Sequence, residues 1–411
     1  MDKKHYTLAL NMIVGAGDGE VLDRCLSAFD CHAAFDEIVI VMTTNDPKVK
    51  KISKKYATLL LQKQWTSERY PYGDFAGARN LALDNTKSDY IMWLDADDVL
   101  TAADIDTKMK NLRNFIDEFG FHVFFVNYCL ERDDSGNETW SILRERIWRK
   151  DSGVRWVYPC HEQLPFDWSV HKKSRLTGVT NIHSPMKLDQ TGVNRNIKIL
   201  EHEYMNPETR DQHIAYYYGR DISLFASMQE CVPIFADLIQ GFDGNGQNIF
   251  ESAIALVRYY LYEKIDVDGF HKINARYLDI VQGYCNIALS INDNCAEPYV
   301  YLGDVFLARN KKDEAAQYYK KAMQKEYGNG MVQQIAYYEA IPASRLSAIY
   351  IEKEEFEQAL WYNKLAKDFF KKNNALASDR HIILKKFIET EIDDMEFKTW
   401  LIQYANKYLV Q

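Results

Sequence analysis

The chain has 411 residues, too many for one hydrophobic core of ordinary size, so two or three domains are expected. Its formal net charge of −9 at pH 7 argues against broad, nonspecific binding of nucleic acid. A hydrophobic share of 47% is typical of a globular protein, and no apolar run is long enough to cross a bilayer.

The seven cysteines are scattered, odd in number and without the spacing of metal ligands. We interpret them as reduced thiols, which predicts a cytoplasmic protein. The start of the chain, residues 1–14, is basic and then apolar, as in a signal peptide. Because the apolar part is short and alternates in the manner of a strand, we interpret it as the first strand instead.

That first strand is predicted at residues 6–14. The glycine-rich turn GAGDGE (15–20) and an amphipathic helix at 21–29 follow it. Strand, turn and helix in this order are typical of a nucleotide-binding unit, in which backbone N–H groups face phosphate or ribose. The glycines simply alternate, so this is not a dinucleotide fingerprint. A flexible turn whose acidic residues favour the helix N-terminus is the alternative interpretation.

Two more strands are predicted at residues 37–42 and 59–62. Between them lie an exit turn, TTNDP at 43–47, and a basic helix at 48–56. Short apolar runs bounded by turn residues are typical of buried strands. Together with the first strand they predict an α/β sheet.

The stretch at residues 74–98 contains an apolar run, 90–94, that ends abruptly in Asp95-Ala96-Asp97-Asp98. The run predicts a buried strand, whose carboxyl end lies at the edge where open α/β sheets bind ligands. Asp95 and Asp97 are two residues apart and could converge on one hard cation, with substrate phosphates completing its shell. The alternative is an acidic turn that caps a helix beginning near Thr101.

Further strands are predicted at residues 121–128 and 141–148, joined by a polar turn. A local excess of basic residues follows the turn: Arg144, Arg146, Arg149, Lys150, Arg155, Lys172, Lys173 and Arg175. Such a cluster is usually a solvated rim, but it could also hold an acceptor that carries phosphate, including nucleic acid.

Two motifs resemble the nucleotide-sugar-binding core of family 2 glycosyltransferases, which have the GT-A fold. The first is a tryptophan, then DFAGARN, then a strand that ends in DADD. Its matching residues are Trp65, Asp74, Phe75, Ala78, Arg79, Asn80, Asp95 and Asp97. The second is RERIWR followed by WVYPCHE, with matches at Arg144, Ile147, Trp148, Arg149, Trp156, His161 and Glu162. The resemblance covers about the first half of the chain.

The resemblance implies a metal-dependent, inverting transfer of a sugar from a nucleoside-diphosphate donor. The implied ligands for Mn²⁺ or Mg²⁺ are Asp95 and Asp97, with His183 completing the shell or only capping a strand. Glu162 is the implied general base, which accepts a proton from the acceptor. Asp98 is the next candidate for the base.

The resemblance also implies a set of donor-binding residues: Val14, Gly15, Asp18, Glu20, Thr43, Asp46, Arg79, Asp95, Ala96 and His161. Arg79 either pairs with an acid as a structural residue, or holds the diphosphate and orients Asp95. His161 either binds phosphate or metal, or only hydrogen-bonds its loop. The family usually has an aspartate at the end of the second strand, where this chain has Met42 or Thr43, so a UDP-sugar is the default donor and not a deduction.

From residue 194 onward, long helical patterns replace the strands. Residues 296–326 resemble a tetratricopeptide repeat, with Tyr299, Leu302, Gly303, Phe306, Ala315, Tyr319 and Ala322 at helix-packing positions. We therefore predict an α/β GT-A domain at residues 1–195, followed at 196–411 by an all-α domain of helical repeats. The repeats could bind the acceptor or mediate oligomerisation.

Two questions stay open at the level of sequence. The acceptor could be a glycan, a peptide or a modified base in nucleic acid. The chain could also be a binding protein whose GT-A domain has lost catalysis, because GAGDGE and Met42 depart from the family pattern.

Overall fold

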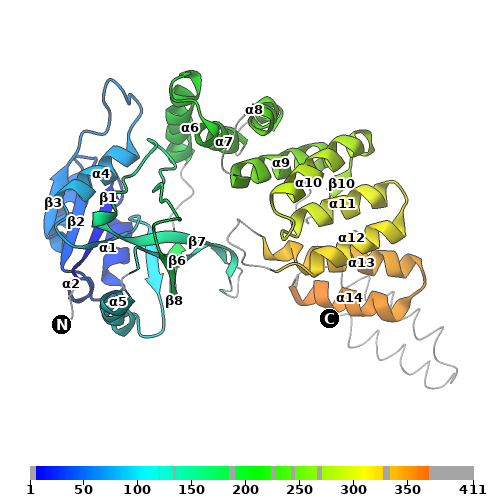
Figure 1. Ribbon diagram of the computed structural model, residues 1–411, viewed down its shortest axis with the longest axis horizontal. Coiled ribbons are helices and arrows are strands. Elements are labelled where there is room, and N and C mark those ends of the chain that lie inside the picture. The colour runs from blue at the N-terminus through cyan, green and yellow to red at the C-terminus, as the bar shows by residue number, and fades with distance from the viewer. Residues whose placement is uncertain are drawn as a thin grey trace. The chain divides into compact units, whose positions relative to one another are not determined.

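The computed structural model forms two compact units, residues 1–225 and 226–411, drawn in Figure 1 in blue to green and in green to orange. The structure describes residues 6–119, 121–132, 136, 138–184, 190–223, 228–241, 246–265, 271–326 and 334–369. Within these residues, no helix combines the length and the hydropathy that a membrane span requires.

An eight-stranded mixed sheet is the core of the first unit, in the order β3-β2-β1-β4-β7-β6-β8-β5. Its strands are β1 (Leu8–Val14), β2 (Glu37–Met42), β3 (Leu59–Gln62), β4 (Tyr90–Trp93), β5 (Asp98–Thr101), β6 (Val123–Arg132), β7 (Glu138–Arg149) and β8 (Lys173–His183). The first four are parallel, whereas β7 runs antiparallel to both β4 and β6. The carboxyl ends of β1, β2 and β4 therefore share one edge.

Helices cover both faces of the parallel strands (Figure 1). The helices of the first unit are α1 (Gly19–Ser27), α2 (Cys31–Ala34), α3 (Pro47–Tyr56), α4 (Phe75–Asn85), α5 (Ile105–Phe119), α6 (Gln190–Met205) and α7 (Gln212–Ser223), with a short 3₁₀ turn at Lys150–Ser152. Alternate side chains of a strand point to opposite faces. Leu10, Met12 and Ile40 accordingly pack with α1, α3 and α5, whereas Ile13 and Val41 pack against α4.

The strands predicted at 6–14, 37–42, 59–62 and 90–94 are confirmed to within a few residues. The helix predicted to start near residues 101–104 begins at Ile105, directly after them, but the acidic turn does not lead straight into it. Residues 98–101 instead form β5, which pairs antiparallel with β8 and buries Asp98 completely. A buried carboxylate needs partners that an exposed helix cap would not supply, and the sheet provides them.

The second unit is a succession of helices, each of which packs on the next. They are α8 (Met228–Gly241), α9 (Gly246–Leu261), α10 (Leu278–Ile291), α11 (Glu297–Ala308), α12 (Lys312–Met323), α13 (Ala340–Glu352) and α14 (Phe356–Phe369). Short 3₁₀ turns lie at Ala275–Tyr277 and Ile335–Tyr337. One hairpin, β9 (Tyr262–Ile265) with β10 (His271–Ile273), interrupts a region that we predicted to be wholly helical.

The tetratricopeptide-like packing is confirmed where α11 meets α12. A Cβ atom added to Gly303 would lie 2.4 Å from the ring of Tyr319, so only glycine allows this close approach. Ala315, Tyr319 and Ala322 are fully buried in the same cluster. The unit is therefore a TPR-like domain built by stacking helix pairs.

The predicted division at residue 195 falls inside α6, whereas the compact units separate after Phe225. Helices α6 and α7 thus belong to the same compact unit as the sheet. Compact units need not coincide with family domains, so the predicted domain boundary at residue 195 stays a prediction.

Candidate active site

The ends of β1 and β2 bring four of the predicted donor-binding residues together. The carbonyl oxygen of Val14 accepts hydrogen bonds from the Thr43 N–H at 2.9 Å and the Thr43 hydroxyl at 3.1 Å. The N–H of Gly15 donates to Oδ2 of Asp18 at 2.6 Å, and burial raises the pKa of that carboxyl group. Val14, Gly15, Asp18 and Thr43 therefore line one stretch of the sheet edge.

Two other predicted donor-binding residues have local structural roles. Asp46 caps the N-terminus of α3, where its side chain accepts the N–H of Lys48 at 2.8 Å. Glu20 is exposed in the first turn of α1, where an acid is favourable to the helix dipole. Their binding of a donor stays a prediction.

Arg79, on α4, connects the acidic turn to the predicted base. Its Nη2 lies 2.6 Å from Oδ1 of Asp95, and its Nε lies 2.5 Å from Oε1 of Glu162. The guanidinium group lies over the rings of Trp93 and Trp156, 4.5 and 5.0 Å from their centres. Although burial acts to raise it, the charges of nearby arginines hold the pKa of Asp95 below its usual value. Arg79 thus orients two carboxylates in a site where its side chain is only 7% exposed.

Two other residues of the DFAGARN motif, Phe75 and Asn80, anchor the loop that carries Glu162. Asn80 exchanges two hydrogen bonds with the backbone of Trp156, at 2.9 and 3.0 Å. The N–H of Phe75 donates to the carbonyl oxygen of Pro159 at 2.9 Å. One helix therefore fixes the loop at two points and binds its carboxylate at a third, which explains why the two sequence motifs occur together.

Three side chains at and beside the acidic turn form a candidate metal centre: Asp97, Asp98 and His183. One ligand atom from each lies within 4.8 Å of the others. Strand pairing makes Asp98 and His183 direct neighbours, and Nδ1 of His183 lies 3.7 Å from Oδ2 of Asp97. Burial, followed by the charge of Asp95, raises the pKa of Asp97 to about 6.

The hydrogen bonds at this centre leave two ligand atoms free. Oδ2 of Asp98 accepts from the N–H of Asp95 at 2.9 Å and from Asn181 at 3.0 Å, and it pairs with Arg146 at 3.1 Å. Within the described residues, Oδ1 of Asp98 and Nδ1 of His183 have no hydrogen-bond partner. Two carboxylates and one imidazole fit Mn²⁺ or Mg²⁺, with phosphate oxygens as further ligands.

The sequence did not predict Asp98 as a metal ligand, because its place in this candidate centre depends on the pairing of β5 with β8. Arg24 was missed too: from α1 its guanidinium group donates to the carbonyl oxygens of Asp97 and Ser184. Asp95 does not belong to the candidate metal group within the described residues, so its predicted role as a ligand stays a prediction. Ala96 is buried between the acids.

His161 precedes Glu162 but does not face the acidic turn. Its Nε2 lies 2.6 Å from Oδ2 of Asp221 on α7. The imidazole of His161 is therefore hydrogen-bonded within the protein. That His161 also binds the donor stays a prediction.

Residues 19–174 match the family model described as Glycosyl transferase family 2. This part of the chain is a family 2 glycosyltransferase domain. It holds β2, β3, β4, Arg79 and Glu162, whereas β1 precedes the matched residues and α7 follows them.

Other similarities are more remote. A TPR repeat-containing protein of Synechococcus elongatus is 29% identical over 155 residues, or 38% of this chain and 34% of that protein, so the match spans about a third of the relative. S. aureus TarS is 12% identical with a TM-score of 0.34, over 69% of this chain and 54% of TarS. A TPR protein of Thermus thermophilus is 18% identical with a TM-score of 0.30, over 47% and 90%. At such TM-scores neither structure bears on the function.

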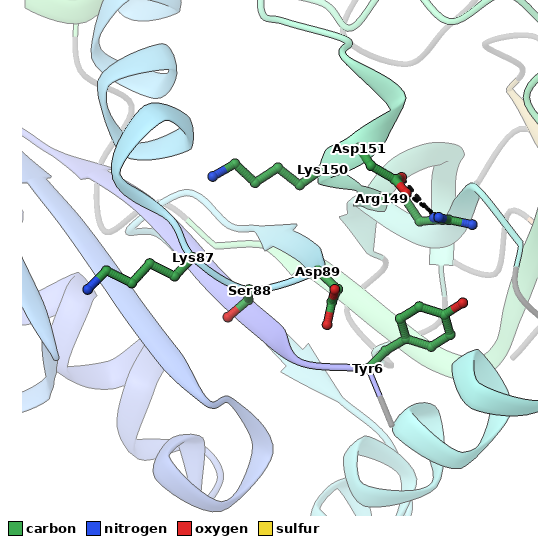
Figure 2. Close-up of a pocket in the computed structure, with 7 residues that line it drawn as sticks. All are labelled: Tyr6, Lys87, Ser88, Asp89, Arg149, Lys150 and Asp151. Atoms are coloured by element: carbon green, nitrogen blue, oxygen red, sulfur yellow. Dashed lines mark hydrogen bonds and ion pairs between the residues drawn. The ribbon is translucent and has the colours of Figure 1, made fainter. Parts of the chain in front are cut away.

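A separate cavity of about 340 Å³ lies at the other end of β4 in the glycosyltransferase domain. It is lined by Tyr6, Lys87, Ser88, Asp89, Arg149, Lys150 and Asp151. Figure 2 shows Arg149 paired with Asp151, while the side chains of Lys87 and Lys150 extend to the side away from Tyr6. Arg149 is the register partner of Tyr90 at the start of β4, and Asp95 follows the end of that strand. The cavity is therefore remote from the candidate site.

We predict that the protein loses stability in acid, because His213 is buried beside the loop that carries Glu162. Nε2 of His213 donates to the carbonyl oxygen of His161 at 2.8 Å, and burial lowers the pKa of His213 to about 3. An unfolded histidine takes up a proton near pH 6.5, whereas the folded protein resists this until about pH 3. His213 therefore has almost no effect on the free energy of unfolding at pH 7, and it should lower that free energy by about 2 kcal/mol at pH 5.

Urea unfolding followed by tryptophan fluorescence at pH 7 and pH 5 measures this effect. His213→Gln, which does not titrate, should lose less stability between the two pH values than the parent. His32→Gln is the matched control, because His32 is exposed. Equal losses in the parent and in His213→Gln would show that His213 is not the group responsible.

Proposed function

We propose that the protein is a metal-dependent, inverting glycosyltransferase that moves a sugar from a nucleoside-diphosphate donor to an acceptor. The observation that carries the proposal is the position of Arg79 within a family 2 domain. One buried guanidinium group holds both the carboxylate at the end of β4 and the carboxylate of the adjacent loop. Such a fixed pair is what a transfer reaction needs at a site that also binds phosphate.

The donor is placed along the carboxyl edge of β1, β2 and β4. Open α/β sheets bind nucleotides at this edge, and the turn at Gly15 presents backbone there. A UDP-sugar is the default donor. A divalent cation held by Asp97, Asp98 and His183, with Asp95 nearby, would supply positive charge against the charge that develops on the leaving diphosphate.

Glu162 is assigned as the general base. It accepts the proton of the acceptor hydroxyl while that oxygen attacks the anomeric carbon of the sugar. The bond from this carbon to the diphosphate breaks, and the diphosphate leaves with the electron pair. The Glu162 carboxylate is held by Arg79 and is only 10% exposed, so it is oriented before the substrate arrives.

We assign the acceptor to the glycan or peptide class and not to nucleic acid. Several arginines of the basic cluster already have partners inside the domain: Arg146 pairs with Asp98, Arg149 with Asp151, and Arg155 with Asp84. Charges neutralised in this way contribute little to binding a phosphate backbone. The TPR-like domain is assigned to protein interaction or to binding the acceptor. All seven cysteines are buried thiols, which supports a reducing, cytoplasmic location.

A thermal-shift panel tests the donor and metal assignments. UDP, GDP and their common sugar conjugates are added with and without Mn²⁺, and a ligand at 100 times its Kd should stabilise the folded protein by about 2.7 kcal/mol. Asp97→Asn should lose the Mn²⁺-dependent part of the shift and keep the melting temperature of the free protein. Asp84→Asn removes an exposed carboxylate and is the control. If Asp97→Asn responds as the parent does, the metal assignment is wrong.

A further inference from the structure

Helix α7 lies beyond the residues that match the family model, yet it contacts the loop that carries Glu162. Asp221 binds the imidazole of His161, and Tyr217 stacks on that ring with the centres 4.4 Å apart and an angle of 17°. His213 donates to the carbonyl oxygen of His161. Helix α7 thus contacts three parts of His161: the Nε2 atom, the face of the ring and the backbone carbonyl oxygen.

The same helix, together with Asp211 just before its first residue, also holds the loop three residues earlier, at Tyr158. The ring of Tyr158 stacks on His213 with the centres 3.8 Å apart, and its hydroxyl donates to Oδ2 of Asp211 at 2.6 Å. Tyr158 and His161 are both in the left-handed region, with φ of +70° and +51°. Residues other than glycine occupy this region less often, at a cost in conformational free energy. The contacts from α7 offset that cost at Tyr158 and His161.

Asp221 is the charged centre of these contacts. It is 2% exposed, and Arg220 donates to its Oδ1 from Nε at 3.0 Å and from Nη2 at 2.8 Å. Although burial acts to raise it, His161 and Arg220 hold the pKa of Asp221 below its usual value. An ionised Asp221 accepts from Nε2 of His161 at 2.6 Å, and Nη2 of Arg220 lies 3.0 Å from the same nitrogen, so both charged groups hold the imidazole in place. Glu162 follows His161 in the chain, and its carboxylate pairs with Arg79.

We propose that Asp221 is a positioning residue for the transfer reaction: by holding His161 in its left-handed conformation, it directs the carboxylate of Glu162 toward the acceptor. This rests on the proposed function of Glu162 as the base. It extends the catalytic apparatus to α7, outside the family 2 domain. Asp221 itself acts only through His161.

The first test compares turnover of Asp221→Ala and Asp221→Asn with that of the parent. The probe is release of the nucleoside diphosphate, with Mn²⁺, from the nucleotide sugar that gives the largest shift in the panel. A base displaced by about 1 Å costs on the order of 10²-fold in rate. Asp221→Ala should therefore lower kcat by about that factor and leave KM within about twofold. Asp221→Asn should recover part of kcat, because its amide oxygen still accepts the Nε2–H bond.

Glu203→Gln is the matched control for a purely structural effect. Glu203 is also a buried carboxylate of the helical segment, and it pairs with Arg69 at 2.7 Å without contacting the base loop. Its variant should keep kcat even if the melting temperature falls. If Glu203→Gln and Asp221→Ala lose kcat equally, or if Asp221→Ala keeps the kcat of the parent, the proposal is overturned.

A second pair of variants, His161→Gly and His161→Ala, tests the backbone of His161, and the comparison of these two does not require an Asp221 variant to fold. Glycine adopts the left-handed region readily, whereas alanine does not. His161→Gly should therefore keep a higher kcat than His161→Ala, and adding Asp221→Asn to His161→Gly should change nothing further. Equal kcat in His161→Gly and His161→Ala would overturn the proposal. A parent that turns over no donor would instead refute the proposed function itself.

Discussion

Replacing Glu162 with glutamine is expected to lower the transfer rate by roughly 10²–10⁴ while donor affinity stays close to that of the parent. The amide has nearly the same shape as the carboxylate, and its oxygen can still accept the Nε–H bond from Arg79. It cannot take a proton from the acceptor at neutral pH. The loss should therefore fall on kcat and spare binding of the donor.

Donor affinity measured by thermal shift, together with the rate of UDP release, separates these two effects. Glu145→Gln is a suitable control, because Glu145 is a partly buried carboxylate that pairs with Arg144 at 3.4 Å. Normal turnover in Glu162→Gln would place the base elsewhere. Asp98, the next candidate from the sequence, is poorly suited, since it is completely buried and its Oδ2 is bound by Arg146.

Replacing Arg146 with methionine is expected to lower the free energy of unfolding by about 3–5 kcal/mol. Arg146 and Asp98 are both fully buried and lie 3.1 Å apart, and Arg146 also lies over the ring of Trp93 at 3.7 Å. Removing the cation leaves a carboxylate with no countercharge in a site of low dielectric constant. The unpaired buried charge and the lost packing therefore both lower the free energy of unfolding.

Two further variants check that explanation by urea unfolding. Arg155→Met breaks an exposed pair with Asp84, in which both side chains are about half exposed, and should cost at most about 1 kcal/mol. The double variant Arg146→Met with Asp98→Asn should be more stable than Arg146→Met alone, because it does not leave the charge of Asp98 buried without its partner. If Arg146→Met is as stable as Arg155→Met, the buried pair does not have the importance assigned to it.

Much of the fold follows from local patterns in the sequence. Apolar runs bounded by turn residues place β1 to β4, since a buried strand needs only a few apolar residues in a row. Small residues at repeat positions predict the packing of α11 on α12, because Gly303 has to meet the ring of Tyr319. The sequence also identifies Arg79 and Glu162 as candidates, by two motifs that resemble one family.

The contacts between those motifs depend on tertiary structure. Arg79 and Glu162 are 83 residues apart, and they meet because Asn80 and Phe75 hold the loop against α4. Asp98 joins His183 only because β5 pairs with β8 at the far end of the sheet order. Asp221 reaches His161 from a helix that local patterns assign to the other domain. Periodicity specifies which residues form a strand or helix, but the order of strands and the docking of helices arise from burial summed over the whole unit, and no short stretch of sequence contains that sum.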